Sequence, residues 1–382
     1  MSIQRCEITA LAHGGHGIGR IDGQVCFVTN ALPGDVVDVD ITKRARGIVW
    51  GVVKNVMTPS PHRTHATCPV FGVCGGCTWL HFAYPAQAEW KRRIVSDCLK
   101  RIAHIETDLG WVEDPVLRLG YRTRAEFHGS SGRWGFYERE SHRIANITSC
   151  PLCHPNLNAA FEKLRAIRFD GEVELVVNPE GDDVLAWCKH PSPAIREMFH
   201  ACDALDSTDR ARFHFDGVPI VNGAFSQSSL LLNRLLLREL KRMVGSPTSL
   251  LDLYCGNGNL SLWLAGQAEV AGFDVNAVAV AAANAVSPGT YTAAPESHFP
   301  TAIASRPWDV IVLDPPRTGA KTITPALVDA RANTLIYVAC DPAALARDLQ
   351  TLTQGGWQIA ETVCLDLFPN TAHVETLCRL FR

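Results

Sequence analysis

The spacing of hydrophobic and polar positions differs between parts of the chain, and it changes near residue 216. Short β-type runs separated by glycine turns fill residues 1–58. Five short strands without a helical period predict a small OB-like barrel, a fold that often binds oligonucleotides. A linker and a stretch of mixed short strands and helices follow, and after 216 long apolar strands alternate with helical patterns. This order predicts an α/β chain with three domains, over 1–58, 62–215 and 216–382.

The most regular pattern of the C-terminal domain runs from a buried strand through a glycine turn to a second strand. Ser249–Tyr254 is the first apolar strand; it leads into Cys255–Asn259 and a further helix, and Val270–Asp274 is the next strand. Strand, glycine turn, helix, strand and terminal acid describe a nucleotide-binding βαβ unit, with Asp274 on ribose hydroxyls. The turn lacks the full dinucleotide glycine fingerprint. That difference favours a mononucleoside ligand such as S-adenosylmethionine.

An Asp-Pro-Pro turn follows the next predicted strand. The apolar run 308–313 leads directly into Asp314-Pro315-Pro316-Arg317. Ligands of such sheets bind outside the carboxyl ends of the strands, so this turn puts a carboxylate and stiff backbone beside the ligand. A bare Asp-Pro-Pro tripeptide can also be a purely structural turn.

Cys340 is expected at a junction between a strand and a helix. The run 334–339 is apolar, Asp341 is a good helix N-cap, and Pro342 is a good first helical residue. Backbone amides and the helix dipole at such a place favour a thiolate, the nucleophilic form of cysteine. The neighbouring carboxylate of Asp341 opposes ionisation. An inert buried thiol is the alternative in a chain with 14 cysteines.

Length and charge limit the classes of function. The chain has 382 residues, 47% of them hydrophobic, and a formal net charge of −3. This suits a globular protein with a real core, and it confines any nucleic-acid site to a local patch. The N-terminus has no apolar signal core, and no apolar run is long enough to span a membrane. We therefore expect a cytoplasmic protein without membrane contact.

Local basic patches are present in the first two predicted domains. Lys43, Arg44 and Arg46 are expected on one hairpin of the barrel. Arginines and aromatic residues interleave between 121 and 143, a pattern that suits phosphate contact with base stacking but also ordinary exposed hairpins. The helical pattern over 84–103 predicts a basic face made of Lys91, Arg92, Arg93 and Arg101.

Four cysteines form a candidate metal site. Cytoplasmic thiols seldom form disulfides, so metal binding and catalysis are their leading uses. Cys68, Cys74 and Cys77 lie within ten residues, and Cys150 is the expected fourth ligand, with Cys153 as the reserve. The spacing alone does not separate zinc from an iron–sulfur cluster.

Together these segments resemble the RNA uracil-C5 methyltransferases that use S-adenosylmethionine, over nearly the whole chain. The barrel is similar to the TRAM domain, and its combination with a cysteine cluster most resembles the bacterial members that methylate 23S ribosomal RNA. Further matches are Phe225–Gln227, Asp252–Asn259, Asp314–Arg317, Tyr337–Pro342 and His373–Thr376. The family has Ser-Cys-Asn-Pro where this chain has Ala339-Cys340-Asp341-Pro342, and Asn where it has Ser229. These departures concern the tuning of the thiol and of ligand contacts.

The resemblance implies a mechanism and a partner. Cys340 is the expected nucleophile toward carbon 6 of uracil, and Glu375 the base that removes the carbon 5 proton. The partner is RNA with an unstacked target base, 23S ribosomal RNA first and transfer RNA second, bound by a monomer. Two alternatives remain: an amino-group methyltransferase, since Asp-Pro-Pro motifs also serve nitrogen methylation, and a non-catalytic RNA-binding or assembly factor.

The resemblance also assigns two ligand sets. The expected S-adenosylmethionine site is lined by Gln227, Tyr254, Asn259, Asp274 and Asp314. The expected metal centre is a structural [4Fe–4S] cluster on Cys68, Cys74, Cys77 and Cys150.

Overall fold

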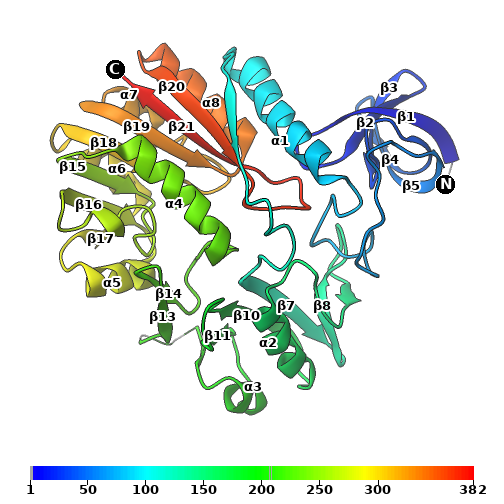
Figure 1. Ribbon diagram of the computed structural model, residues 1–382, viewed down its shortest axis with the longest axis horizontal. Coiled ribbons are helices and arrows are strands. Elements are labelled where there is room, and N and C mark those ends of the chain that lie inside the picture. The colour runs from blue at the N-terminus through cyan, green and yellow to red at the C-terminus, as the bar shows by residue number, and fades with distance from the viewer. Residues whose placement is uncertain (1–2, 206, 208) are drawn as a thin grey trace.

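The chain folds around a barrel and a series of sheets. The computed structural model describes residues 3–205, 207 and 209–382, and in it a closed barrel is followed by six-stranded, two-stranded and eight-stranded sheets. Helix α1 (Tyr84–Cys98) lies between the barrel and the C-terminal sheet, and the six-stranded sheet lies below them (Figure 1). No helix of the described residues is long and apolar enough to cross a membrane.

The N-terminal barrel has the strand order β1-β2-β3-β5-β4. Its strands are β1 (Ile3–Leu11), β2 (Gly17–Ile21), β3 (Gln24–Thr29), β4 (Val36–Ala45) and β5 (Ile48–Thr58). Alternate residues point inward, among them the fully buried Val28, Val37 and Val49. A side chain at Gly51 would collide with Val39, so glycine lets the strands approach closely enough to close the barrel. The predicted OB-like barrel is confirmed.

The central sheet has the order β12-β11-β10-β7-β8-β9. Its elements are β7 (Arg124–Ser130), β8 (Arg133–Tyr137), β9 (Ile144–Asn146), β10 (Gly171–Val177), β11 (Val184–Trp187), β12 (Cys202–Asp203), α2 (Pro155–Arg165) and α3 (Pro193–Met198). Phe127, Trp134 and Phe161 fill the core between sheet and α2. The hairpin of β13 (Arg212–Phe215) and β14 (Val218–Val221) packs against β10 and β11, so residue 216 lies within one folded hairpin.

The C-terminal sheet has the order β17-β16-β15-β18-β19-β21-β20-β6. Its strands are β15 (Ser249–Leu253), β16 (Glu269–Asp274), β17 (Tyr291–Ala293), β18 (Trp308–Leu313), β19 (Ala332–Ala339), β20 (Gln358–Leu365), β21 (Glu375–Phe381) and β6 (Leu109–Val112). Strands β15 to β19 are parallel, and β21 is antiparallel to both of its neighbours. The predicted methyltransferase-type α/β domain is confirmed.

Helices cover both faces of this sheet. They are α4 (Leu230–Val244), α5 (Ala277–Val286), α6 (Phe299–Ala304), α7 (Thr324–Val328) and α8 (Pro342–Gln354). In β18, Val310 and Val312 join the apolar core under α4, whereas Ile311 and Leu313 join the core on the opposite face. A strand buried on both faces needs such a continuous apolar run, which is why the pattern was evident in the sequence.

Two features differ from the sequence-based expectations. The segment 84–112, expected in the central domain, packs on the C-terminal sheet: Val95 and Leu99 enter its core, and β6 pairs with β20. The helix expected after Asn259 is a single 3-10 turn, η2 (Leu262–Leu264). Gly258 and Gly266 have positive φ on either side of that turn, so the segment is too short for a longer helix.

Candidate active site

Cys340 lies between β19 and α8, at the carboxyl edge of the sheet. The Asp341 side chain caps α8 by accepting hydrogen bonds from the backbone N–H groups of Ala343 (3.0 Å) and Ala344 (2.8 Å). Burial, followed by the carboxyl groups of Glu375 and Asp314, raises the pKa of Cys340 to about 11, against the opposing effect of Arg317. The thiol is therefore protonated in the free protein, and an added positive charge would favour its ionisation.

Glu375 is the cross-strand neighbour of Cys340. Strand β21 pairs with β19 so that Thr376 is opposite Ala339, and continuing this register by one residue brings Glu375 to Cys340. The Glu375 side chain is buried, and its Oε1 atom has no hydrogen-bond partner. Burial and the neighbouring Asp314 raise its pKa well above the ordinary value. Such a carboxyl group is suited to proton transfer.

Two further acids lie at the same edge of the sheet. Asp314 directly follows β18, and burial raises its pKa to about 7. Asp252, in β15, is also raised to a pKa of about 7 by burial, although Ser261 opposes the shift by donating a hydrogen bond of 2.6 Å. Carboxyl groups gathered at the ends of parallel strands are typical of a site that binds a ligand and carries out chemistry.

A cavity lies between the turn after β15, the start of α4 and the segment that precedes α4. Four of the expected cofactor residues line it: Gln227, Tyr254, Asn259 and Asp314. The buried hydroxyl of Ser226, which also lines the cavity, has no hydrogen-bond partner. Tyr254 has a left-handed backbone (φ 63°), a conformation that is costly for this residue type and is often found at functional sites. The cavity therefore fits a polar ligand such as a nucleoside.

Asp274 does not line that cavity but shapes its wall. Its carboxylate accepts hydrogen bonds from the backbone N–H groups of Gly256 (2.9 Å) and Asn276 (2.7 Å). These bonds hold the turn between β15 and η2 against the end of β16. Asp274 thus supports the turn from the end of β16, and its predicted contact with a ribose stays a prediction.

Sequence reasoning missed Asn233 on α4. Its side-chain amide exchanges hydrogen bonds of 2.7 and 3.1 Å with that of Asn259, and both residues line the cavity. The signal was available, because Asn233 is a buried polar residue in a helix that is otherwise leucine-rich on that side. Phe225 is 64% exposed beside the cavity, with the Arg124 guanidinium 5.1 Å from its ring centre.

The cysteines expected to bind a metal surround a second, small cavity. Its lining includes all four: Cys68, Cys74, Cys77 and Cys150. The reserve ligand Cys153 is buried but is not part of this lining. Burial and, to a smaller extent, the neighbouring thiols raise the pKa of Cys77 to about 12. Four thiols around one cavity form a donor set that a cation would stabilise.

The spread of the cysteine sulfurs bears on the kind of metal. Around one tetrahedral zinc the sulfurs lie roughly 3.8 Å apart, given Zn–S bonds of about 2.3 Å. Among the described residues, one group has three candidate ligands whose donor atoms lie within 4.8 Å of one another. It consists of Glu126, His128 and Glu172. No three of the described cysteine sulfurs lie within 4.8 Å of one another, whereas a single zinc ion would gather all four ligands that closely. A polynuclear cluster fits that arrangement.

The Glu126, His128 and Glu172 group does not have the geometry of a metal site. His128 Nε2 faces Glu126 Oε1 at 3.7 Å, and His128 Nδ1 faces Glu172 Oε1 at 3.4 Å. One metal ion binds only one nitrogen of an imidazole ring. The group is better described as a histidine between two carboxylates on neighbouring strands.

A loop of the barrel reaches the active site. His13 Nε2 lies 3.6 Å from Asp341 Oδ2, next to Cys340. The Trp79 indole N–H donates a hydrogen bond of 3.2 Å to Gly15 O. Gly15 has φ 89°, and a side chain there would lie 2.7 Å from the Ala372 methyl group. The barrel is therefore packed closely against the loop that precedes Glu375.

Comparison with known proteins agrees with this architecture. Family profiles match residues 2–54 (TRAM domain), 219–336 (Methyltransferase small domain) and 302–382 (tRNA (Uracil-5-)-methyltransferase). The crystal structure of the Pyrococcus abyssi tRNA (uracil-54, C5)-methyltransferase with S-adenosyl-L-homocysteine superposes with a TM-score of 0.77, covering 98% of this chain and 99% of that one. Its sequence identity of 24% shows a shared fold.

Curated relatives match along the full length. An uncharacterized RNA methyltransferase of Thermosynechococcus vestitus is 32% identical, covering 98% of this chain and 97% of its own. The 23S rRNA (uracil(1939)-C(5))-methyltransferase RlmD of Chromohalobacter salexigens is 31% identical, covering 98% and 89%. The chain belongs to the family of RNA uracil-C5 methyltransferases that carry a TRAM domain.

Proposed function

We propose that this protein transfers a methyl group from S-adenosylmethionine to carbon 5 of a uridine in RNA, with Cys340 as nucleophile and Glu375 as base. The observation that carries the proposal is the pairing of β19 with β21, which makes these two side chains neighbours. Asp314 stands beside both and also lines the cavity of the cofactor. The nucleophile, the proton acceptor and the methyl donor can therefore meet at one uracil ring.

Carbon 5 of uracil becomes nucleophilic only after addition at carbon 6. Cys340 loses its proton to solvent, and its sulfur bonds to carbon 6 while the carbon 5–carbon 6 π electrons form an enolate. When bound, S-adenosylmethionine supplies the methyl group that carbon 5 takes up and departs as S-adenosylhomocysteine. Glu375, which must be in its carboxylate form at this step, then removes the carbon 5 proton; the double bond re-forms and the carbon 6–sulfur bond breaks, which releases Cys340 as thiolate.

The charges around Cys340 suit this order of steps. Its raised pKa keeps the thiol unreactive in the free protein. Arg317 is the nearby cation that lowers the pKa of Cys340, and a positively charged cofactor bound near the thiol would lower it further.

Covalent trapping tests the proposal. RNA that carries 5-fluorouridine has no proton at carbon 5 for Glu375 to remove, so a methylated Cys340 adduct should persist on a denaturing gel with labelled RNA. Cys340→Ala is the control and should form no adduct. Methylation without any adduct would indicate an amino-group methyltransferase, and RNA binding without methylation would indicate a binding factor.

For the substrate we propose 23S ribosomal RNA. Three relatives named as 23S rRNA (uracil(1939)-C(5))-methyltransferases are 30 or 31% identical over 97–98% of this chain. The transfer-RNA enzyme that shares the fold is 24% identical. Mapping 5-methyluridine in ribosomal and transfer RNA of cells with and without the gene separates the two. Loss of the modified uridine from transfer RNA alone would overturn this choice.

Two surfaces support RNA binding. On the barrel hairpin the Lys43 ammonium lies 5.3 Å from the centre of the Trp50 ring, which offers a charge and a stacking face together. On the central sheet an open groove is lined by Tyr137, Arg139 and His142. Both surfaces combine cations with aromatic rings, the combination that unpaired bases and their phosphates require.

For the metal we propose a structural [4Fe–4S] cluster on Cys68, Cys74, Cys77 and Cys150. All four cysteines line one cavity, and no three of their sulfurs lie within 4.8 Å of one another, which supports the proposal. Protein purified without oxygen should be brown and contain about four irons per chain. A colourless protein with one zinc per chain would overturn this assignment.

A further inference from the structure

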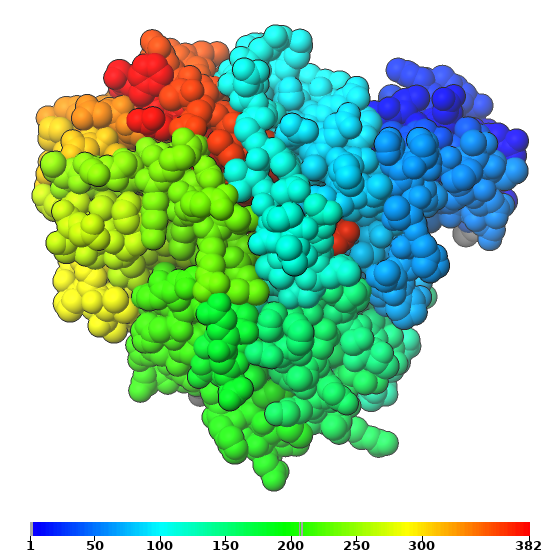
Figure 2. All heavy atoms as spheres, in the orientation of Figure 1, coloured from blue at the N-terminus to red at the C-terminus, as the bar shows by residue number. Residues whose placement is uncertain are grey.

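The loop 366–374 joins β20 to β21 and leads directly into Glu375. Its backbone is held by residues 78–121, far away in the sequence. The backbone N–H of Trp79 donates to Asn370 O (3.0 Å), and that of Ala372 donates to Thr78 Oγ1 (2.9 Å). In Figure 2 a small red patch of C-terminal residues is visible between cyan and blue surfaces of the N-terminal half. The N-terminal half thus encloses the loop.

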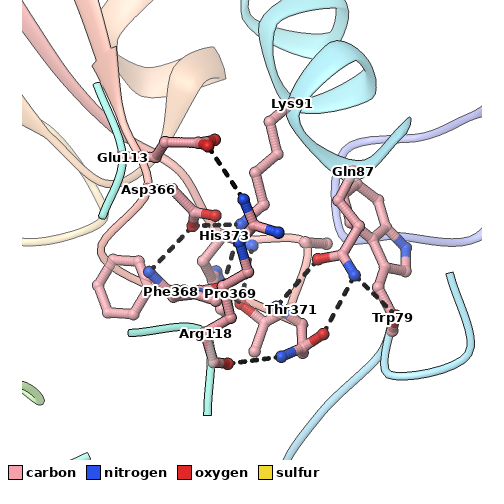
Figure 3. A network of polar contacts seen from close by, with 12 residues as sticks. Trp79, Gln87, Lys91, Glu113, Arg118, Asp366, Phe368, Pro369, Thr371 and His373 are labelled. Atoms are coloured by element: carbon pink, nitrogen blue, oxygen red, sulfur yellow. Dashed lines mark hydrogen bonds and ion pairs between the residues drawn. The ribbon is translucent and has the colours of Figure 1, made fainter. Parts of the chain in front are cut away.

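The side chain of Gln87, on α1, joins the loop to residues 79 and 82 through several hydrogen bonds (Figure 3). Its Oε1 accepts a hydrogen bond from the backbone N–H of Asn370 (3.0 Å), and its Nε2 donates to Asn370 Oδ1 (3.1 Å). The same Nε2 donates to the carbonyl groups of Trp79 and Phe82. Asn370 has a left-handed backbone (φ 65°), and these bonds hold it there. Gln87 is fully buried, so no water can replace them.

Lys91, one helical turn further, holds the beginning of the loop. Its ammonium donates to Asp366 Oδ1 (2.7 Å) and to Phe368 O (3.0 Å), and both charged side chains are fully buried. The Tyr84 hydroxyl donates to the other Asp366 oxygen (2.7 Å). Lys91 therefore does not belong to the basic surface that the helical pattern predicted. Its position one turn from Gln87 directs both side chains into the loop.

Glu375 has little to orient it locally. Its Oε1 has no hydrogen-bond partner, so the direction of the carboxyl group depends on where the backbone places it. That backbone is fixed on one side by the pairing of Glu375 with Leu365 and on the other by the loop. A displacement of about 1 Å at a reacting group can cost about a hundredfold in rate.

We propose that Gln87 and Lys91 are positioning residues, which hold loop 366–374 so that the Glu375 carboxyl group reaches the carbon 5 proton. The inference rests on the proposed function. Helix α1 precedes the C-terminal domain in the sequence. The inference gives this helix a role in the removal of the carbon 5 proton. Methyl transfer precedes that step and depends on Cys340 and the cofactor cavity, which α1 does not line.

The test measures two steps of a single turnover separately, methyl transfer to RNA and release of the methylated RNA from Cys340. In Gln87→Met, methyl transfer should keep its rate, whereas release should slow about tenfold to a hundredfold, so that methylated adduct accumulates. Glu89→Met, on the exposed face of α1, is the matched control and should leave both steps unchanged. Combining Gln87→Met with Glu375→Gln should slow release no further than Glu375→Gln alone.

A second variant keeps the test usable if Gln87→Met fails to fold. Lys91→Met combined with Asp366→Leu replaces a buried ion pair by apolar groups, an exchange that often preserves stability. It should show the same selective slowing of release. Equal slowing of methyl transfer and release in both variants, or additive effects with Glu375→Gln, would overturn the proposal. Failure of the wild-type protein to methylate uridine would instead overturn the proposed function.

Discussion

The buried pair of Lys91 and Asp366 permits a quantitative prediction of stability. In Lys91→Met, Asp366 loses its charged partner but keeps the hydrogen bonds from the Tyr84 hydroxyl and the Phe368 backbone N–H. Removing one member of a buried pair costs about 3–5 kcal/mol. The two remaining hydrogen bonds place the expected loss in unfolding free energy at the lower end, about 3 kcal/mol.

Calorimetry tests this prediction. At about 2–4 °C per kcal/mol for a domain of roughly this size, the Tm of the C-terminal domain should fall by about 6–12 °C. Lys91→Met combined with Asp366→Leu should recover much of the loss, because no charge is then left unpaired in the interior. Arg92→Met, at the neighbouring exposed position, is the control and should change Tm little. A single variant as stable as the wild type, or a double variant less stable than the single one, would refute the reasoning.

Three further predictions concern the chemistry. Cys340→Ala should abolish methyl transfer while S-adenosylmethionine still binds, which calorimetric titration would measure; turnover above about a hundredth of the wild-type rate would contradict an obligate nucleophile. Glu375→Gln should methylate RNA but accumulate the adduct, because the carbon 5 proton has no acceptor; wild-type turnover without adduct would require another base. Because the pKa of Cys340 is raised to about 11 and the reactive form is the thiolate, kcat/KM should rise with pH across the neutral range, and a profile that falls with pH would contradict thiolate attack.

Local sequence determined the junction that carries Cys340. A run of apolar residues, an N-capping aspartate and a proline at the first helical position each act within a few residues. They therefore specify strand, cap and helix wherever the segment lies in the fold, and all three are present. The barrel was predictable for the same reason, because alternation and glycine turns are local signals. The family of the chain followed from the order of its motifs.

Tertiary structure alone decided what surrounds that junction. The antiparallel insertion of β21 beside β19 makes Glu375 the neighbour of Cys340, and strand register is a property of two distant segments. Lys91 has the pattern of a surface lysine and becomes buried only because Asp366 arrives from a loop far along the chain. Strand β6 likewise joins β20 through backbone bonds that carry no sequence signature. Local patterns specify elements, whereas partners are chosen by the packing of the whole chain.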